Sequence, residues 1–185
     1  RRKPPSEPGR VALLHALAHI ELNAIDLAAD ILVRFPAAKP PLSFFSDWLC
    51  VLDDEARHFL MLSDRLAAMG VAYGDLPAHD GLWQAAQDTA DDLLARLAVV
   101  PLVLEARGLD VTPGIIDSLL RAGDEESAAV LDVIYRDEIC HVAVGRKWFE
   151  YFCKGDPEQM WRDLVAKYFR GALKPPFNDD ARAEA

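Results

Sequence analysis

Two short segments of the sequence place a histidine three residues after a glutamate, at Glu55–His58 and at Glu138–His141. Residues three apart lie on the same face of an α-helix, so each pair can hold one metal ion from a single helix. Two further glutamates, Glu21 and Glu105, precede these pairs by nearly the same interval. Four helices that each contribute a glutamate, two of them adding a histidine, supply the side chains of a carboxylate-bridged two-metal centre.

The neighbours of each glutamate on its own helix face are almost all apolar, and none is a lysine or an arginine. An unpaired buried carboxylate is costly and normally takes a proton or binds a cation. Two divalent metals would balance four carboxylates and two neutral histidines. We therefore predict two metal ions, bridged by Glu55 and Glu138. The full set of predicted ligands is Glu21, Glu55, His58, Glu105, Glu138 and His141. The alternative is a metal-free set of carboxylic acids and carboxylate–histidine hydrogen bonds.

An aspartate stands directly before the glutamate of each pair, at Asp54 and Asp137. Neighbouring positions on a helix are turned by about 100°, so each aspartate is better placed to reach the histidine of the opposite helix than its own. A carboxylate there would fix the orientation of the imidazole through the second ring nitrogen. Arg57 could neutralise one of these aspartates. The alternative is that both are ordinary surface acids.

Proline and glycine divide the chain into helical segments, and no segment shows the period-two alternation of a strand. We expect helices over residues 10–35, 43–69, 81–109, 113–122, 123–154 and 156–170. The sequence thus predicts an all-α, up-down four-helix bundle over residues 10–172, with an additional C-terminal helix. A long crossover at residues 70–80 joins the second and third major helices, and residues 1–9 and 173–185 form extended flanking segments.

Pro101 lies one turn before Glu105. It removes a backbone donor, so we expect the helix to be bent or loosened beside the metals. Small residues also occur on the faces that carry the predicted ligands. They either leave room for a substrate or dioxygen, or let the helices pack closely: Ala18, Ala24, Ala28, Ala98, Gly108 and Gly145.

Length and composition limit the class of protein. A chain of 185 residues with 51% hydrophobic content can bury one core, so we expect a single domain. A net charge of −10 disfavours nucleic acid and anionic membrane surfaces as partners. Three scattered cysteines favour reduced thiols and a cytoplasmic location, and no apolar run is long enough for a membrane span.

The run Asp54-Glu55-Ala56-Arg57-His58 resembles the D-E-x-R-H signature of bacterial di-iron hydroxylases, and the run 137–141 matches it except for Cys140. With the segments HIELNAIDLA, EARGLDVTPG and PPFN, these runs make residues 10–182 similar to an uncharacterised family of the ferritin-like superfamily, whose members are two-iron carboxylate proteins. A more distant similarity is to the tRNA-modifying di-iron hydroxylase. The resemblance implies the helix bundle and the metal site, but it carries no substrate.

We expect a di-iron oxidoreductase, an oxygenase or hydroxylase that uses dioxygen on a small or modified organic substrate. Iron fits the ligands best, although they also accommodate manganese or zinc. The sequence carries no flavin or nicotinamide fingerprint, so the electrons would come from a donor protein. We expect a monomer or homodimer. The alternatives are an iron-handling protein without an organic substrate, a tRNA-modifying hydroxylase, and a bundle in which the metals are only structural.

Overall fold

The computed structural model describes residues 6–78 and 81–185, and within these residues the regular structure is entirely helical. The main helices are α1 (Glu7–Arg34), α2 (Leu42–Ala68), α3 (Gly81–Asp88), α4 (Leu93–Val99), α5 (Ala106–Arg121), α6 (Glu125–Phe152), α7 (Pro157–Tyr168) and α8 (Asp179–Glu184). A 3₁₀ turn, η1 (Pro36–Ala38), follows α1, and a π-helical turn, η2 (Val100–Glu105), joins α4 to α5. Parts of the predicted N-terminal extension and of the crossover, residues 1–5 and 79–80, lie outside this description.

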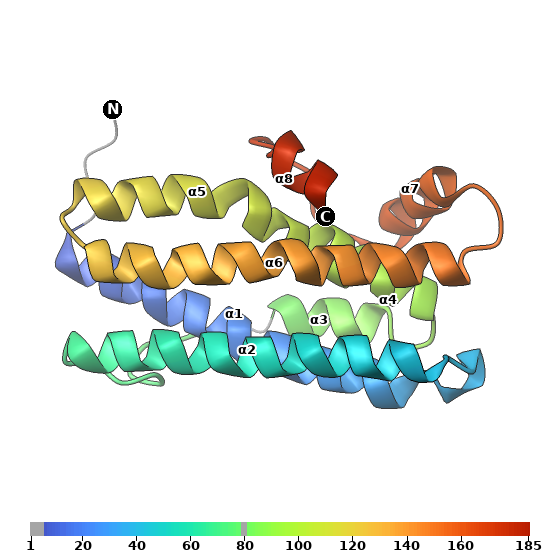
Figure 1. The fold of residues 1–185 in the computed structure, drawn as a ribbon, viewed down its shortest axis with the longest axis horizontal. Helices are drawn as coiled ribbons and strands as arrows, with labels where there is room; N and C mark the ends of the chain where they lie inside the picture. Colours follow the sequence, from blue (N-terminus) through green and yellow to red (C-terminus); the bar gives the residue numbers. More distant parts are fainter. Residues whose placement is uncertain (1–5, 79–80) are drawn as a thin grey trace.

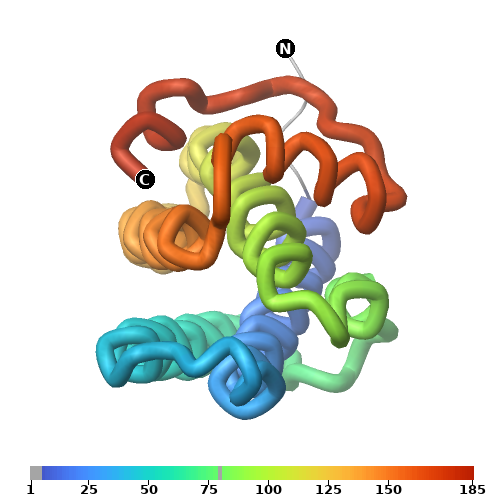
Figure 2. The backbone as a smooth tube through the Cα atoms, turned by 90° about the vertical axis from the view of Figure 1, so that its right-hand side faces the viewer, coloured from blue at the N-terminus to red at the C-terminus, as the bar shows by residue number. Residues whose placement is uncertain are grey.

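The long helices form two antiparallel pairs, α1 with α2 and α5 with α6 (Figure 1). Helix α2 also packs against α6, which joins the pairs. Helices α2 and α5 run in the same direction, so the chain between them returns along the molecule, with α3 against α1 and η2. Viewed from the end, the C-terminal segment arcs over the outer side of α5 from α7 to α8 (Figure 2).

Aspartate and asparagine side chains start several of these helices. The carboxylate of Asp92 accepts a hydrogen bond from the N–H of Ala95, and that of Asp124 accepts one from Ser127. Such caps satisfy backbone donors that have no partner inside the helix. Gly70, just beyond the end of α2, has a φ of 78°, a left-handed conformation that glycine adopts without strain.

The continuous helix expected over residues 81–109 is wrong, because the chain breaks at residues 89–92. The buried Arg96 side chain accounts for the break. Its Nε donates to the hydroxyl of Thr89 at 2.8 Å, and its Nη2 donates to the carbonyl of Ala86 at 2.6 Å. These bonds hold the end of α3 against α4, and a straight helix could not supply them.

The break expected before Pro113 is also wrong, since α5 runs through this proline. A proline inside a helix leaves the carbonyl four residues earlier without its usual partner. Here that carbonyl, of Leu109, accepts a hydrogen bond of 3.1 Å from the side-chain amide of Asn178. Asn178 also caps α8, so the C-terminal flank predicted as extended at 173–185 is helical over Asp179–Glu184.

Two hydrophobic clusters fill the space between the helix pairs. One contains Leu14, Leu62, Leu66 and Leu131, and the other contains Ile31, Phe44, Trp48, Trp148 and Phe149. Along α1, α2 and α6, the predicted ligands lie in the sequence between residues of the first cluster and residues of the second. Among the described residues, no helix combines the length and apolar character needed to cross a membrane.

The C-terminal segment is fastened to α5 through the buried carboxylate of Asp110. This carboxylate accepts hydrogen bonds from Arg182 at 2.8 and 2.7 Å and from the N–H of Asn178 at 2.9 Å. Asn178 also bonds the hydroxyl of Tyr135 on α6. The segment therefore ties α5 to α6 close to Glu105 and Glu138.

Replacing Asp110 by asparagine should release this segment. Burial raises the pKa of Asp110, but Arg182 and the Asn178 N–H outweigh it and lower the pKa below the usual 3.8. The carboxylate therefore stabilises the fold at neutral pH, and this contribution disappears as the pH falls through the lowered pKa. For Asp110→Asn we expect a loss of about 2 kcal/mol in the free energy of unfolding and faster amide exchange over residues 174–184.

The matched control is Asp117→Asn, which removes the same charge from an exposed position on α5. It should leave the exchange rates and the stability unchanged. Equal exchange in both variants would show that Asp110 does not hold the C-terminal segment.

Candidate metal centre

The six predicted ligands come from four helical stretches and lie at one level between the two hydrophobic clusters. Glu21 lies on α1, Glu55 and His58 on α2, Glu105 at the end of η2, and Glu138 and His141 on α6. Glu21, Glu55, His58 and His141 are buried, with exposed fractions of 6%, 1%, 0% and 1%. Glu105 and Glu138 are partly buried.

Five of these side chains form a continuous cluster. The Nδ1 atom of His58 lies 3.3 Å from Glu21 and 3.7 Å from Glu55. The Nδ1 atom of His141 lies 3.0 Å from Glu55 and 3.4 Å from Glu138. One donor atom each from Glu21, Glu55, His58 and Glu138 all fall within 4.8 Å of one another, a spacing that can hold a metal ion. Glu55 lies between the two imidazoles.

Glu105 stands slightly apart from this group. Its carboxyl lines the same cavity, of about 170 Å³, as Glu21, Glu55 and Glu138. Burial raises the pKa of Glu105 well above its usual range, and the charges of Glu138 and Glu55 raise it further. Glu105 is therefore close enough to interact with the other carboxylates across the cavity.

Most of the buried polar atoms that lack a hydrogen-bond partner belong to this cluster. The described residues contain nine such side-chain atoms, and six are here: both oxygens of Glu55, Oε2 of Glu105 and of Glu138, and Nδ1 of His58 and of His141. The short distances between them do not have hydrogen-bond geometry. Because buried polar groups are nearly always satisfied, these atoms indicate a missing partner, and carboxylate oxygen with imidazole nitrogen suits a divalent metal.

The pKa values show how much positive charge the cluster attracts. Burial raises the pKa of Glu21 and Glu138, whereas His141 and His58 outweigh burial at Glu55 and lower its pKa. Burial lowers the pKa of both histidines, but the surrounding carboxylates raise it to about 10 for His58 and about 12 for His141. In the absence of another cation, protons would therefore supply the compensating charge.

Two aspartates hold the far side of the histidine rings. Asp137 lies 3.0 Å from Nε2 of His58, and Asp54 lies 3.4 Å from Nε2 of His141, and both contacts run between α2 and α6. Arg57 pairs with both aspartates and lies 3.0 Å from Asp137. In a neutral imidazole, a carboxylate at Nε2 favours the Nε2–H tautomer, which leaves the lone pair on Nδ1, the nitrogen that faces the glutamates. The sequence assigned Arg57 to one aspartate, and the structure shows it bridging two.

The π-helical turn η2 places Glu105. Pro101, the second residue of this turn, lies next to α6, and a Cβ atom added at Gly145 would lie 2.3 Å from the Cβ of Pro101. Gly145 therefore allows close packing of the two elements. Gly108 differs, since an added Cβ would meet nothing within 4 Å and the residue lines the cavity, as does Ala24. Close helix packing thus explains the small residue at Gly145, whereas Gly108 and Ala24 leave open space beside the predicted ligands.

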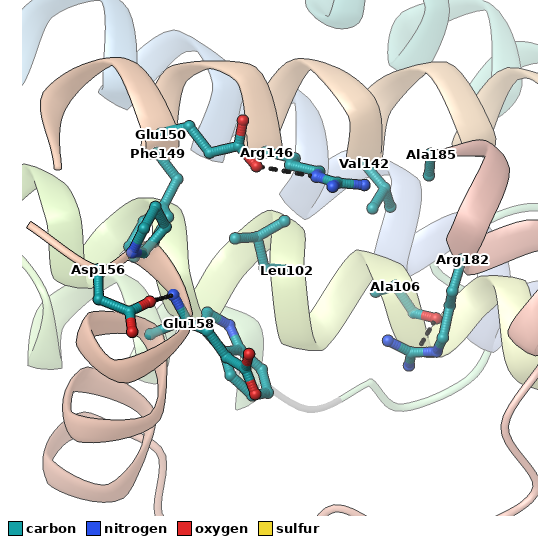
Figure 3. A pocket seen from close by; sticks show the side chains of 12 residues that line it. Leu102, Ala106, Val142, Arg146, Phe149, Glu150, Asp156, Glu158, Arg182 and Ala185 are labelled. Carbon is teal, nitrogen blue, oxygen red and sulfur yellow. Dashed lines mark hydrogen bonds and ion pairs between the residues drawn. The ribbon is translucent and has the colours of Figure 1, made fainter.

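A larger groove, of about 450 Å³, lies between η2, α6, α7 and α8, and none of the six predicted ligands lines it (Figure 3). Its charged groups already have partners. Arg146 pairs with Glu150 at 3.0 Å, and Arg182 donates to the carbonyl of Ala106 at 3.3 Å. Of the nine unpartnered buried atoms on the described residues, Nε1 of Trp161 lies on a residue that lines this groove, whereas four carboxylate oxygens lie on residues that line the smaller cavity.

Comparison with known proteins leads to proteins without a stated function. The family described as "Protein of unknown function (DUF455)" matches residues 1–185. The chain is also similar to an uncharacterized protein of Haemophilus influenzae, with 41% identity over 193 residues that cover 100% of the chain and 67% of that protein. No solved structure matches the chain. Chemical roles for the cluster must therefore be argued from its own side chains.

Gly145 and Gly114 offer a test of the packing that positions Glu105. Gly145→Ala would push η2 away from α6, and we expect a loss of about 1–3 kcal/mol in the free energy of unfolding from overpacking. Gly114→Ala on α5 meets no neighbour and should stabilise the helix by up to about 1 kcal/mol. Urea denaturation of both variants measures the difference. A neutral Gly145→Ala would contradict the close contact with Pro101.

Proposed function

We propose that this chain, which belongs to the DUF455 family of proteins of unknown function, has a function that depends on its buried carboxylate–histidine cluster. The protein would be a ferritin-like di-iron oxidoreductase that oxidises an organic substrate with dioxygen. The observation that carries it is the set of six buried, unpartnered oxygen and nitrogen atoms on Glu55, His58, Glu105, Glu138 and His141. The antiparallel helix pairs and the D-E-x-R-H resemblance support the ferritin-like bundle.

The cluster divides into two overlapping halves. Glu21 and His58 would hold one iron, and Glu105 and His141 would hold the other. Glu55, which lies between the two histidines, and Glu138 would be shared. Four carboxylates and two neutral imidazoles balance two Fe²⁺ ions. The same side chains also suit manganese or zinc, so the identity of the metal is part of the proposal.

When bound, two irons would supply the redox chemistry that activates dioxygen. In the overall reaction a C–H bond becomes C–OH, one oxygen atom leaves as water, and two electrons and two protons are consumed. The electrons would come from an external donor protein. The chain's own contribution is to orient the histidines through Asp54 and Asp137, and to keep Glu55 and the other ligands out of water.

The cavity beside the cluster favours an organic substrate over iron handling. Its walls include Leu17, Ile20, Leu104, Val111, Leu131 and Ile134. These apolar side chains offer hydrated iron ions nothing in place of lost water, and only the four glutamates of the same lining do. An apolar molecule, by contrast, gains from leaving water.

Metal uptake tests the proposal. Anaerobic incubation with Fe²⁺ should give two irons per chain, and the loaded protein should then consume dioxygen. Glu55→Gln should lose both irons, because this carboxylate contacts both histidines. The control Glu150→Gln, at an exposed position on α6, should bind two. Fewer than two irons in the unaltered chain would end the proposal, and assembly into a shell of many subunits would favour iron storage.

Neighbouring aspartates test the support of the histidines. Asp54→Asn removes the acceptor at His141, and we expect a metal affinity about 10–100-fold weaker. Asp53→Asn makes the same change one residue earlier, at an exposed position, and should bind metal normally. Titration with a competing chelator measures both. If the two variants bind equally, Asp54 has no role in holding the site.

A further inference from the structure

The cavity at the cluster is a chamber between α1 and α5. Its sides come from Leu17 and Ile20 on α1 and from Gly108, Val111 and Thr112 on α5, and Leu131 and Ile134 of α6 complete the apolar wall. Four glutamates share the lining, namely Glu21, Glu55, Glu105 and Glu138. The chamber thus brings an apolar volume directly against the carboxylates.

The size of the chamber limits what can enter. Its volume is about 170 Å³. An apolar cavity of roughly 150 Å³ is large enough to stay dry and to bind benzene. Ile20, which is 41% exposed, lies where the lining meets the surface, so the mouth of the chamber is apolar as well.

Charge limits the ligand further. Among the described residues that line the chamber, the basic side chain is Arg107. Its guanidinium already donates to the carbonyls of Lys174 and Pro176 at 2.7 and 2.8 Å and pairs with Asp110. An anionic ligand would therefore meet four glutamates and an arginine that is already engaged. A cationic ligand would compete with the metals for the same carboxylates.

We propose that the chamber binds a small, uncharged, mainly hydrocarbon group of about the size of benzene, either as a whole molecule or as the end of a longer one. The group would enter between Ile20 of α1 and Val111 of α5 and lie against the carboxylates. The statement that this hydrocarbon group belongs to the substrate rests on the proposed function. The selectivity of the chamber for such a group does not.

Two glycines on α5 provide a matched pair of variants. A side chain at either Gly108 or Gly114 would meet no neighbouring atom within 4 Å of its Cβ, but only Gly108 lines the chamber. Gly108→Leu should fill the volume, and Gly114→Leu should place the same side chain on an exposed part of the helix. Val111→Phe fills the chamber from one turn further along, away from Glu105.

The experiment measures binding of toluene and of benzoate to the protein as isolated, by saturation-transfer NMR, with the metal content determined in the same samples. Toluene should bind the unaltered chain and Gly114→Leu, and its signal should be lost in Gly108→Leu and Val111→Phe. Benzoate should not bind. Absence of toluene binding to the unaltered chain, undiminished binding to both filled variants, or binding of benzoate would overturn the inference.

The two readouts separate this inference from the proposed function. Metal-loaded protein that does not bind toluene would reject the chamber and leave the metal site intact. Protein that contains no metal and takes up none, yet binds toluene with the expected pattern, would reject the di-iron function and keep the selectivity of the chamber.

Discussion

The structure depends on the electrostatic cost of enclosing four carboxylates between two hydrophobic clusters. An ionised group in such surroundings costs several kcal/mol even after the protein relaxes, and a domain is stable by only about 5–15 kcal/mol in total. Lysine and arginine are absent from the faces that carry these glutamates, and the histidines leave their Nδ1 atoms unpartnered. Compensation must therefore come from protons or from metal ions, and two divalent cations match the charge of the set.

The surrounding elements serve to keep these side chains at one level. Asp54 and Asp137 fix the histidine rings from outside, and Arg57 holds the two aspartates together. On the opposite side, the close contact between Pro101 and Gly145 sets the π-helical turn that ends at Glu105. The C-terminal segment completes the support, since it ties α5 to α6 one turn beyond the glutamates.

Local periodicity was enough to predict the helical class, the glutamates and histidines that gather in the buried cluster, and the aspartates that cross to the opposite histidines. It failed where the deciding partner is distant in the sequence. Helix α5 continues through Pro113 because the side chain of Asn178 donates a hydrogen bond to the carbonyl of Leu109. The sequence around Pro113 does not predict that bond. The break near Thr89 likewise depends on the buried Arg96. Gly108 and Gly145 look alike in the sequence, yet one faces the chamber and the other faces Pro101, so the chamber could not be foreseen.

In the proposed function, the buried cluster encloses two metal ions. Anomalous diffraction from crystals of the protein, collected on both sides of the iron absorption edge, tests it most directly. Two separate peaks should appear, both within bonding distance of Glu55 and each beside one of the two histidines. A map without peaks at this level, in which protonated carboxyl groups and histidines bond one another instead, would contradict it.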